Sequence, residues 1–220
     1  MTYELVVLDM AGTTVVDDGL VEGAFARAWD RVRGTDDGRA AAMEHVRATM
    51  GQSKIDVFRG IADEEGAQAL NQAFEVSFRE LIAEGRCTPI AGAEEAIREL
   101  RGRGLRIAFT TGFSRPTADA ILASLGWTEL ADAVVTPADA GRGRPAPDMI
   151  LTALIRTGTS SVAGIVNVGD TESDAASGRA AGAGLVVGVL TGTRDAAALT
   201  SAGADLVLSS VAELPLTLAP

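Results

Sequence analysis

Residues 4–14 read ELVVLDMAGTT, and this stretch decides how the rest of the chain is interpreted. The segment Glu4 to Leu8 is typical of a short buried strand, and Asp9 follows it on a loop rich in Gly and Thr. In an open parallel sheet, ligands bind beyond the carboxyl ends of the strands. An aspartate at such a position can act as a nucleophile, a metal ligand or both.

After Thr14 the sequence becomes helical in character. Residues from about 20 to 85 are rich in Ala, Arg, Glu and Asp, with apolar residues at helical spacing. The expected helices are 20–33, 36–49, 53–62 and 65–84. Because one strand precedes this block and the others follow it, we expect a helical cap, residues 17–88, inserted into an α/β core formed by 1–16 and 89–220.

From residue 88 onward, short apolar runs alternate with helical segments. The predicted strands are 105–109, 133–135, 165–168, 185–190 and 206–208, and the predicted helices are 92–103, 115–125, 147–157, 172–182 and 194–201. Short apolar strands separated by helices indicate a parallel sheet that is covered on both faces. The predicted fold class is therefore α/β, with a Rossmann-like core.

Composition narrows the possible partners. The formal net charge of −11 argues against nucleic acid and anionic membranes, which call for basic patches. Cys87 is the only cysteine, so no intramolecular disulfide forms and a reducing, cytoplasmic setting fits best. The N-terminal residues lack the pattern of a signal peptide, and no run approaches the ~18 apolar residues of a membrane span.

Polar residues follow four of the predicted strands. They are Asp9, then Thr110-Thr111-Gly112, then Arg144 in RGRP, and finally Asp170 with Asp174. Each could be an ordinary turn or helix-cap residue. Together at successive strand ends, they favour a phosphoryl group bound beside Mg²⁺, which prefers carboxylate ligands.

These motifs resemble the haloacid dehalogenase superfamily of aspartate-nucleophile hydrolases, and the resemblance covers essentially the whole chain. It is carried by DMAGTT, FTTG, GRPAPDM and VGDTESD. It implies that Asp9 is the nucleophile and forms an aspartyl-phosphate. The implied Mg²⁺ site comprises Asp9, the Ala11 carbonyl, Asp170 and Asp174, the last as ligand or close neighbour. The implied phosphoryl-binding residues are Gly12, Thr13, Thr111, Gly112 and Arg144.

Two residues point to an unusual reaction within this superfamily. Ala11 stands where its phosphatases usually carry a second aspartate as general acid and base, and loss of such help typically costs ~10²–10⁴-fold. Lys54 is the only lysine among 19 basic residues, and an amine can form an imine where a guanidinium cannot. An imine lets a neighbouring phosphorus–carbon bond break toward an enamine, so no alkoxide needs a proton.

The segment Met50 to Asp56 is similar to the part of the cap that carries the imine-forming lysine of the phosphonatases, the phosphonoacetaldehyde hydrolases. That resemblance implies a small phosphonate substrate and a homodimer formed through the caps. The chain departs from it at three places. Val57 occupies a position where the phosphonatases have a histidine. Asp18-Gly19-Leu20 occupies the place of a loop that contains a cysteine, and Phe113 the place of a tyrosine.

Other functions stay open from sequence. A phosphatase or mutase could act on a phosphate ester, with Lys54 only positioning the substrate. A phosphoacceptor signalling module also uses an aspartate at a strand end, and a catalytically silent binding protein is a further alternative. We expect Thr191-Gly192-Thr193 to be a plain turn and His45 to lie on a cap helix outside the site.

Overall fold

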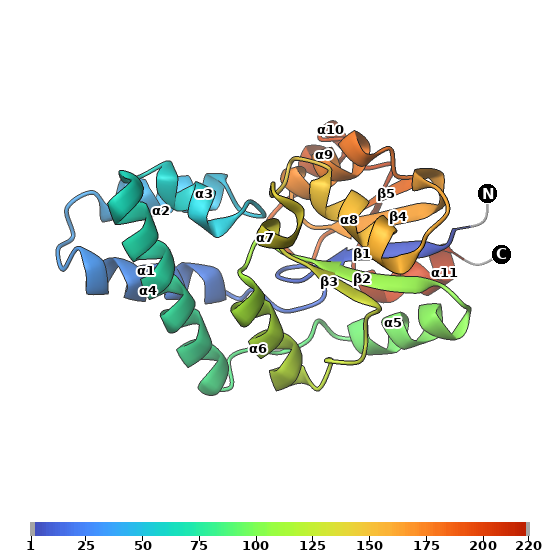
Figure 1. The fold of residues 1–220 in the computed structure, drawn as a ribbon, viewed down its shortest axis with the longest axis horizontal. Coiled ribbons are helices and arrows are strands. Elements are labelled where there is room, and N and C mark those ends of the chain that lie inside the picture. The colour runs from blue at the N-terminus through green and yellow to red at the C-terminus, as the bar shows by residue number, and fades with distance from the viewer. Residues whose placement is uncertain (1–2, 219–220) are drawn as a thin grey trace.

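The computed structural model describes residues 3–218, and its centre is a six-stranded parallel sheet (Figure 1). The strands are β1 (Leu5–Asp9), β2 (Arg106–Thr110), β3 (Ala133–Val135), β4 (Ile165–Gly169), β5 (Leu185–Val189) and β6 (Leu206–Leu208). Their order is β3-β2-β1-β4-β5-β6. The predicted α/β class is confirmed, and each predicted strand lies within two residues of its observed bounds.

The first strand lies in the middle of the sheet. Val7 pairs with Ala108 of β2 on one side and with Asn167 of β4 on the other. All of β1 is buried, and successive side chains enter different clusters: Val6 and Leu8 one, Leu5 and Val7 another. A strand buried on both faces needs apolar side chains on both, which is why Leu5 to Leu8 form a continuous apolar run.

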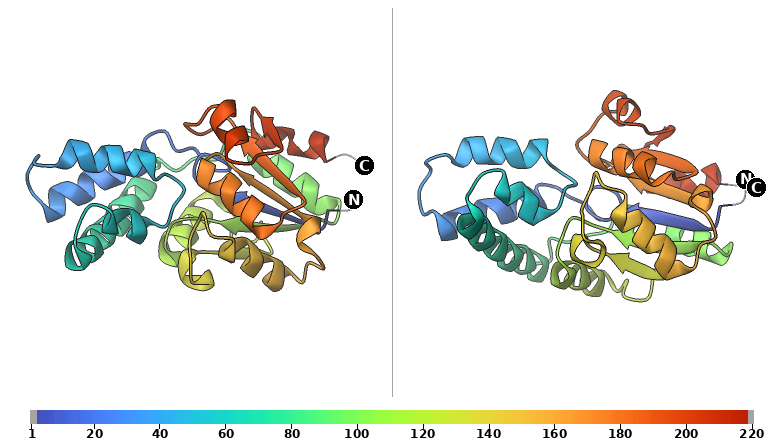
Figure 2. Two further views of the ribbon diagram at one scale, coloured as in Figure 1. Left: turned by 90° about the horizontal axis from the view of Figure 1, so that it is seen from above. Right: turned by 45° about the horizontal axis from the view of Figure 1, so that its top comes forward.

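Helices cover both faces of the sheet (Figure 2). They are α5 (Ala93–Gly102), α6 (Arg115–Leu125), α7 (Pro137–Ala140), α8 (Asp148–Thr157), α9 (Glu172–Ala181), α10 (Ala196–Ser201) and α11 (Leu214–Thr217). Helix α8 packs on β1–β3, and α9 and α10 pack on β4–β6. Helix α5 packs on β2 and contacts α11.

Four helices form a separate block between β1 and β2 in the chain: α1 (Leu20–Val32), α2 (Arg39–Ala48), α3 (Lys54–Arg59) and α4 (Glu64–Ala83). We call residues 20–83 the helical block. It lies beyond one end of the sheet in every view (Figures 1 and 2). Its interior is aromatic, with Phe58 between Phe25 and Phe74 at ring-centroid distances of 6.2 and 5.7 Å.

The block contacts the core through side chains as well as through the connections. Glu75 of α4 accepts hydrogen bonds from the hydroxyl groups of Ser114 and Thr117, at the start of α6. Arg194 donates to the carbonyl oxygen of Arg47 at 2.9 Å. The block is therefore seated on the core.

Several short elements were absent from the sequence prediction. They are α7, α11 and the 3₁₀ turns Val162–Gly164 and Val211–Glu213. Helix α7 has four residues and depends on a capping box between Thr136 and Asp139, too short for a periodic signal. Helix α2 begins at Arg39 rather than at 36, after Gly38 with φ of +76°. Within residues 3–218, none of the helices has the length and apolar character needed to cross a bilayer.

Candidate active site

Three aspartates meet at the carboxyl ends of β1 and β4. Asp9 is the last residue of β1, Asp170 directly follows β4, and Asp174 lies in the first turn of α9. All three are buried, and one oxygen from each lies within 4.8 Å of the others. The parallel register of β1 and β4 brings these strand ends together although they are far apart in sequence.

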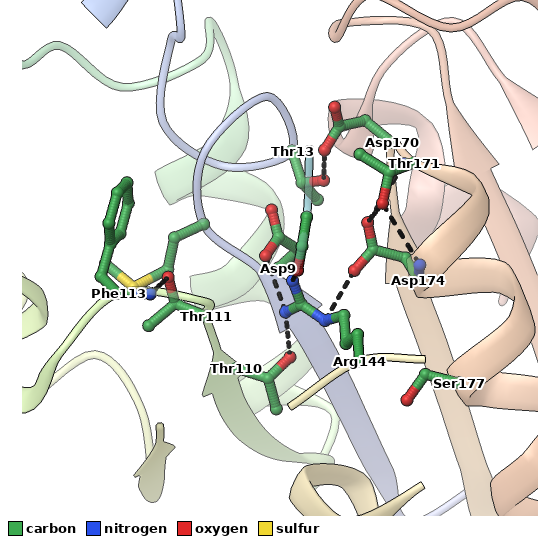
Figure 3. Close-up of polar contacts among 12 residues, drawn as sticks. Asp9, Thr13, Thr110, Thr111, Phe113, Arg144, Asp170, Thr171, Asp174 and Ser177 are labelled. Carbon is green, nitrogen blue, oxygen red and sulfur yellow. Dashed lines mark hydrogen bonds and ion pairs between the residues drawn. The ribbon is translucent and has the colours of Figure 1, made fainter. Parts of the chain in front are cut away.

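Arg144 links two of these carboxylates (Figure 3). Its guanidinium contacts Asp9 Oδ1 at 2.7 Å and Asp174 Oδ1 at 2.8 Å, and it also donates to Thr110 Oγ1 at 2.8 Å. A further donor reaches the carbonyl oxygen of Gly51 in the helical block at 3.2 Å. Arg144 therefore joins the strand ends to the block.

The carboxyl groups outnumber the cations beside them. Burial raises the pKa of Asp170 well above its usual range, and the charges of Asp9 and Asp174 raise it further. Burial also raises the pKa of Asp9, which Arg144 partly opposes. Two cations, Arg144 and Lys54, lie near these three aspartates. The cluster therefore has an excess of negative charge, which suits a hard divalent cation. The residues present therefore fit the predicted Mg²⁺.

The loop after β1 packs tightly against this cluster. Gly12 has φ of +87°, and a Cβ there would lie 2.4 Å from Asp170 Oδ2, so only glycine fits. The hydroxyl of Thr13 is fully buried and donates to Asp170 Oδ1 at 3.0 Å. Gly12 lines the cavity described below, whereas the side chain of Thr13 points to Asp170.

A cavity of about 400 Å³ lies between the strand ends and the helical block. From the predicted set, it is lined by Asp9, Ala11, Gly12, Lys54, Thr111, Gly112, Arg144 and Asp170. Asp174 lies behind Arg144. Both of its oxygens are engaged, one by Arg144 and the other by the hydroxyl and N–H groups of Thr171.

Lys54 is the first residue of α3, and its side chain turns into this cavity. The residue is 8% exposed, and Nζ lies 5.2 Å from the ring centroid of Phe113. Burial lowers the pKa of the ammonium group, while the charges of Asp17 and Asp9 oppose that shift. Across residues 3–218, no carboxylate lies within ion-pairing distance of Nζ. The amine thus faces the site without a direct partner.

The segment before Lys54 touches the core so closely that glycines are needed there. A Cβ on Gly112 would lie 2.2 Å from the carbonyl oxygen of Gln52, and one on Gly143 would lie 2.9 Å from Ser53 Cβ. The backbone N–H of Lys54 donates to the Gly112 carbonyl at 3.1 Å. Backbone contacts with the core therefore set the position of the lysine.

Some lining residues were not predicted as part of the site. Asp17, in the connection from β1 to α1, borders the cavity with Lys54. Thr191, Gly192 and Thr193 also line it, and the Thr191 hydroxyl donates to the Gly12 carbonyl at 2.6 Å. Their only sequence signal is their place in a loop next to a strand. His45 is absent from the lining, as expected.

Known proteins resemble this chain in sequence and in fold. A family model described as haloacid dehalogenase-like hydrolase matches residues 3–182. The chain therefore belongs to the haloacid dehalogenase-like hydrolases and is a hydrolase. A curated relative from Bacillus cereus, phosphonoacetaldehyde hydrolase, is 33% identical over 217 residues, covering 89% of this chain and 78% of the relative.

Solved structures agree with the fold. A hydrolase from Pseudomonas syringae has a TM-score of 0.84 at 23% identity, covering 99% of this chain and 97% of that one. A phosphonoacetaldehyde hydrolase-like protein from Oleispira antarctica has a TM-score of 0.82 at 23% identity, covering 98% and 91%. At this level of identity, the likeness shows the fold alone.

Proposed function

We propose that this hydrolase cleaves the phosphorus–carbon bond of a small phosphonate aldehyde, held as an imine on Lys54, and transfers the phosphoryl group to Asp9. One observation carries the proposal. The chain's only lysine is buried in the same cavity as Asp9, while position 11 is alanine. The similarity to a phosphonoacetaldehyde hydrolase supports it.

The proposed reaction has three stages. The neutral amine of Lys54 adds to the aldehyde to give a carbinolamine, which takes up one proton from an acid and loses water to leave an iminium ion. The Asp9 carboxylate then attacks phosphorus, and the electrons of the phosphorus–carbon bond form an enamine. Protonation and hydrolysis release the shortened aldehyde and the free amine, and a second water releases phosphate from Asp9. No step needs a proton donor at position 11.

The other predicted residues bind the charged end of the substrate in this proposal. Gly12, Thr111 and Gly112 line the cavity and would hold phosphoryl oxygens together with the neighbouring Thr13, and Arg144 would supply positive charge. Asp9, the Ala11 carbonyl and Asp170 would hold Mg²⁺. When bound, the ion would stabilise negative charge on phosphoryl oxygens. Asp174, whose oxygens are engaged, would chiefly orient Arg144.

The helical block serves as a cap in this proposal, with residues 17–88 as one domain and 1–16 plus 89–220 as the other. Closure over the strand ends would exclude water during transfer to Asp9. A homodimer through the caps and a cytoplasmic location stay predictions. Light scattering on the purified protein tests the dimer.

Phosphate release from phosphonoacetaldehyde and from a panel of phosphate esters tests the function, with wild type compared to Lys54→Arg. Arginine keeps the charge and cannot form an imine. We expect the variant to lose phosphonate cleavage by at least about 10³-fold. In parallel, borohydride should trap an irreversible adduct on Lys54 of the wild type, identified by mass spectrometry.

Two results would decide against this function. Equal turnover by wild type and Lys54→Arg would mean that the lysine is not a covalent catalyst. Efficient phosphate-ester hydrolysis with no trapped adduct would favour the phosphatase alternative. In both cases Asp9→Asn should abolish turnover, because either route needs the aspartyl-phosphate.

A further inference from the structure

Asp17 occupies a place in the cavity that the proposed reaction has not used. It lies in the connection between β1 and α1, and its side chain is partly buried. Its Oδ1 accepts a hydrogen bond from the backbone N–H of Val21 at 2.9 Å. Within residues 3–218, Asp17 forms no ion pair with an arginine, whereas Asp9 on the same cavity pairs with Arg144. Its carboxyl group is therefore anchored at the start of α1.

Asp17 and Lys54 face the same space from different elements. Both line the cavity, one from the connection before α1 and the other from the start of α3. Of the negative charges around Lys54, that of Asp17 acts on it most strongly, ahead of Asp9. Burial raises the pKa of Asp17, so its carboxyl holds a proton more readily than an exposed aspartate. The two side chains make no direct ion pair.

The remaining lining groups are poorly suited to proton transfer at the aldehyde carbon. Asp9 would accept the phosphoryl group in the proposed reaction, and Asp170 belongs to the aspartate cluster that would hold Mg²⁺. Asp18 also lines the cavity but is exposed. Ala11 and Phe113 carry no acid or base. Among the carboxyl groups that border the cavity in residues 3–218, Asp17 is thus the one that is neither exposed nor part of the aspartate cluster.

Imine formation needs such a group. When the Lys54 amine adds to an aldehyde, the product is a carbinolamine, whose hydroxyl leaves readily only after it gains a proton. We propose that the carboxyl of Asp17 donates this proton: the carbon–oxygen bond breaks, water departs, the nitrogen lone pair forms the C=N bond, and Asp17 becomes a carboxylate. In product release the carboxylate takes a proton from the water that attacks the iminium carbon. This inference rests on the proposed function.

The test is the rate at which the imine appears on Lys54, measured by quenching phosphonoacetaldehyde mixtures with borohydride and quantifying the adduct by mass spectrometry. Asp17→Asn is the main variant, because asparagine keeps an oxygen for the Val21 N–H and removes the acid. We expect adduct formation to slow by roughly 10²–10³-fold. Asp17→Glu should recover part of the rate.

Asp56→Asn is the matched control. Asp56 lies on α3 two residues after Lys54, but its side chain is 55% exposed and pairs with Arg59 at 3.1 Å. The control should form the adduct at the wild-type rate. If Asp17→Asn does not fold, as judged by thermal unfolding, the comparison of Asp17→Glu with wild type decides the question, since a misplaced acid should still slow the step.

The outcomes separate the two proposals. No adduct in the wild type would overturn the proposed function itself. An adduct that forms equally fast in wild type and in folded Asp17→Asn would overturn only the role of Asp17. A slow adduct in Asp17→Asn, partial recovery in Asp17→Glu and a normal rate in the control would establish it.

Discussion

The contact between Gly112 and Gln52 makes a sharp prediction about how the block positions Lys54. In Gly112→Ala the new Cβ would lie 2.2 Å from the Gln52 carbonyl oxygen, whereas a carbon–oxygen contact needs about 3.3 Å. The segment before Lys54 must therefore retreat by about 1 Å. Gly112 does not have a left-handed φ, so alanine causes no backbone strain of its own.

A displacement of about 1 Å in a catalytic group can cost ~10²-fold in rate. We therefore expect kcat/KM to fall about 10²-fold, equivalent to about 2.7 kcal/mol of transition-state stabilisation. The assay is phosphate release from whichever phosphonate or phosphate ester the wild type turns over best. Because the interiors of block and core are untouched, the unfolding midpoint should change little.

Gly102→Ala is the control, because a Cβ there would meet nothing within 4 Å. It should leave kcat/KM unchanged. A second readout uses the single lysine: chemical acylation of Lys54, followed by mass spectrometry, should be faster in Gly112→Ala than in either wild type or control. Wild-type kcat/KM and labelling in Gly112→Ala would refute the view that backbone contact with the core sets the position of the amine.

Three further predictions follow from buried charge. Asp170→Asn removes one of the crowded carboxylates, so calorimetry without metal should show a free energy of unfolding about 1 kcal/mol higher than that of wild type. Mg²⁺ should no longer raise the unfolding midpoint of this variant. In wild type, a hundredfold excess of Mg²⁺ over its Kd should add about 2.7 kcal/mol. Glu75→Ala leaves the hydroxyls of Ser114 and Thr117 without their acceptor, which should cost about 1–3 kcal/mol in urea unfolding. Burial lowers the pKa of Lys54 below its usual 10.5, so borohydride trapping should decline as pH falls through that lowered value. Since the unfolded chain binds the lysine proton more tightly, Lys54 should make stability rise with pH between the folded pKa and 10.5.

A specific result would contradict each of these predictions. A stabilising effect of Mg²⁺ that survives Asp170→Asn would place the ion elsewhere. Unchanged urea unfolding of Glu75→Ala would show that its hydrogen bonds to α6 add no net stability. For Lys54, an inflection at the pKa of an exposed lysine would mean that the amine is solvated in solution, and Lys54→Met should remove the stability trend with pH.

Local sequence predicted most of the fold because the relevant signals are short-range. Leu5 to Leu8 of β1 are all apolar, as a strand buried on both faces requires. Helix α1 was found from its apolar spacing. In contrast, α7 has four residues and exists because Thr136 and Asp139 cap it, so its pattern is too short to read.

The sequence predicted the site residues that follow strands, but it did not predict those whose place depends on packing between distant segments. Asp9 and Asp170 could be placed because parallel strands bring their carboxyl ends to one edge. Asp17 gave no such signal, since its importance depends on facing Lys54 from another element. The role of Thr191 likewise depends on a loop packing against Gly12, which is remote in sequence.

The amino-acid sequence by itself determined the sheet, the aspartates at the strand ends and the presence of a single lysine amine. Hydrophobic periodicity and residue chemistry can be recognised within short stretches of sequence. Only the tertiary structure decided that this amine is buried in the same cavity as Asp9. Its burial comes from the seating of the block, where the backbones at Gln52 and Gly112 touch and Arg144 reaches Gly51. Such contacts depend on the positions of distant segments, so no local pattern encodes them.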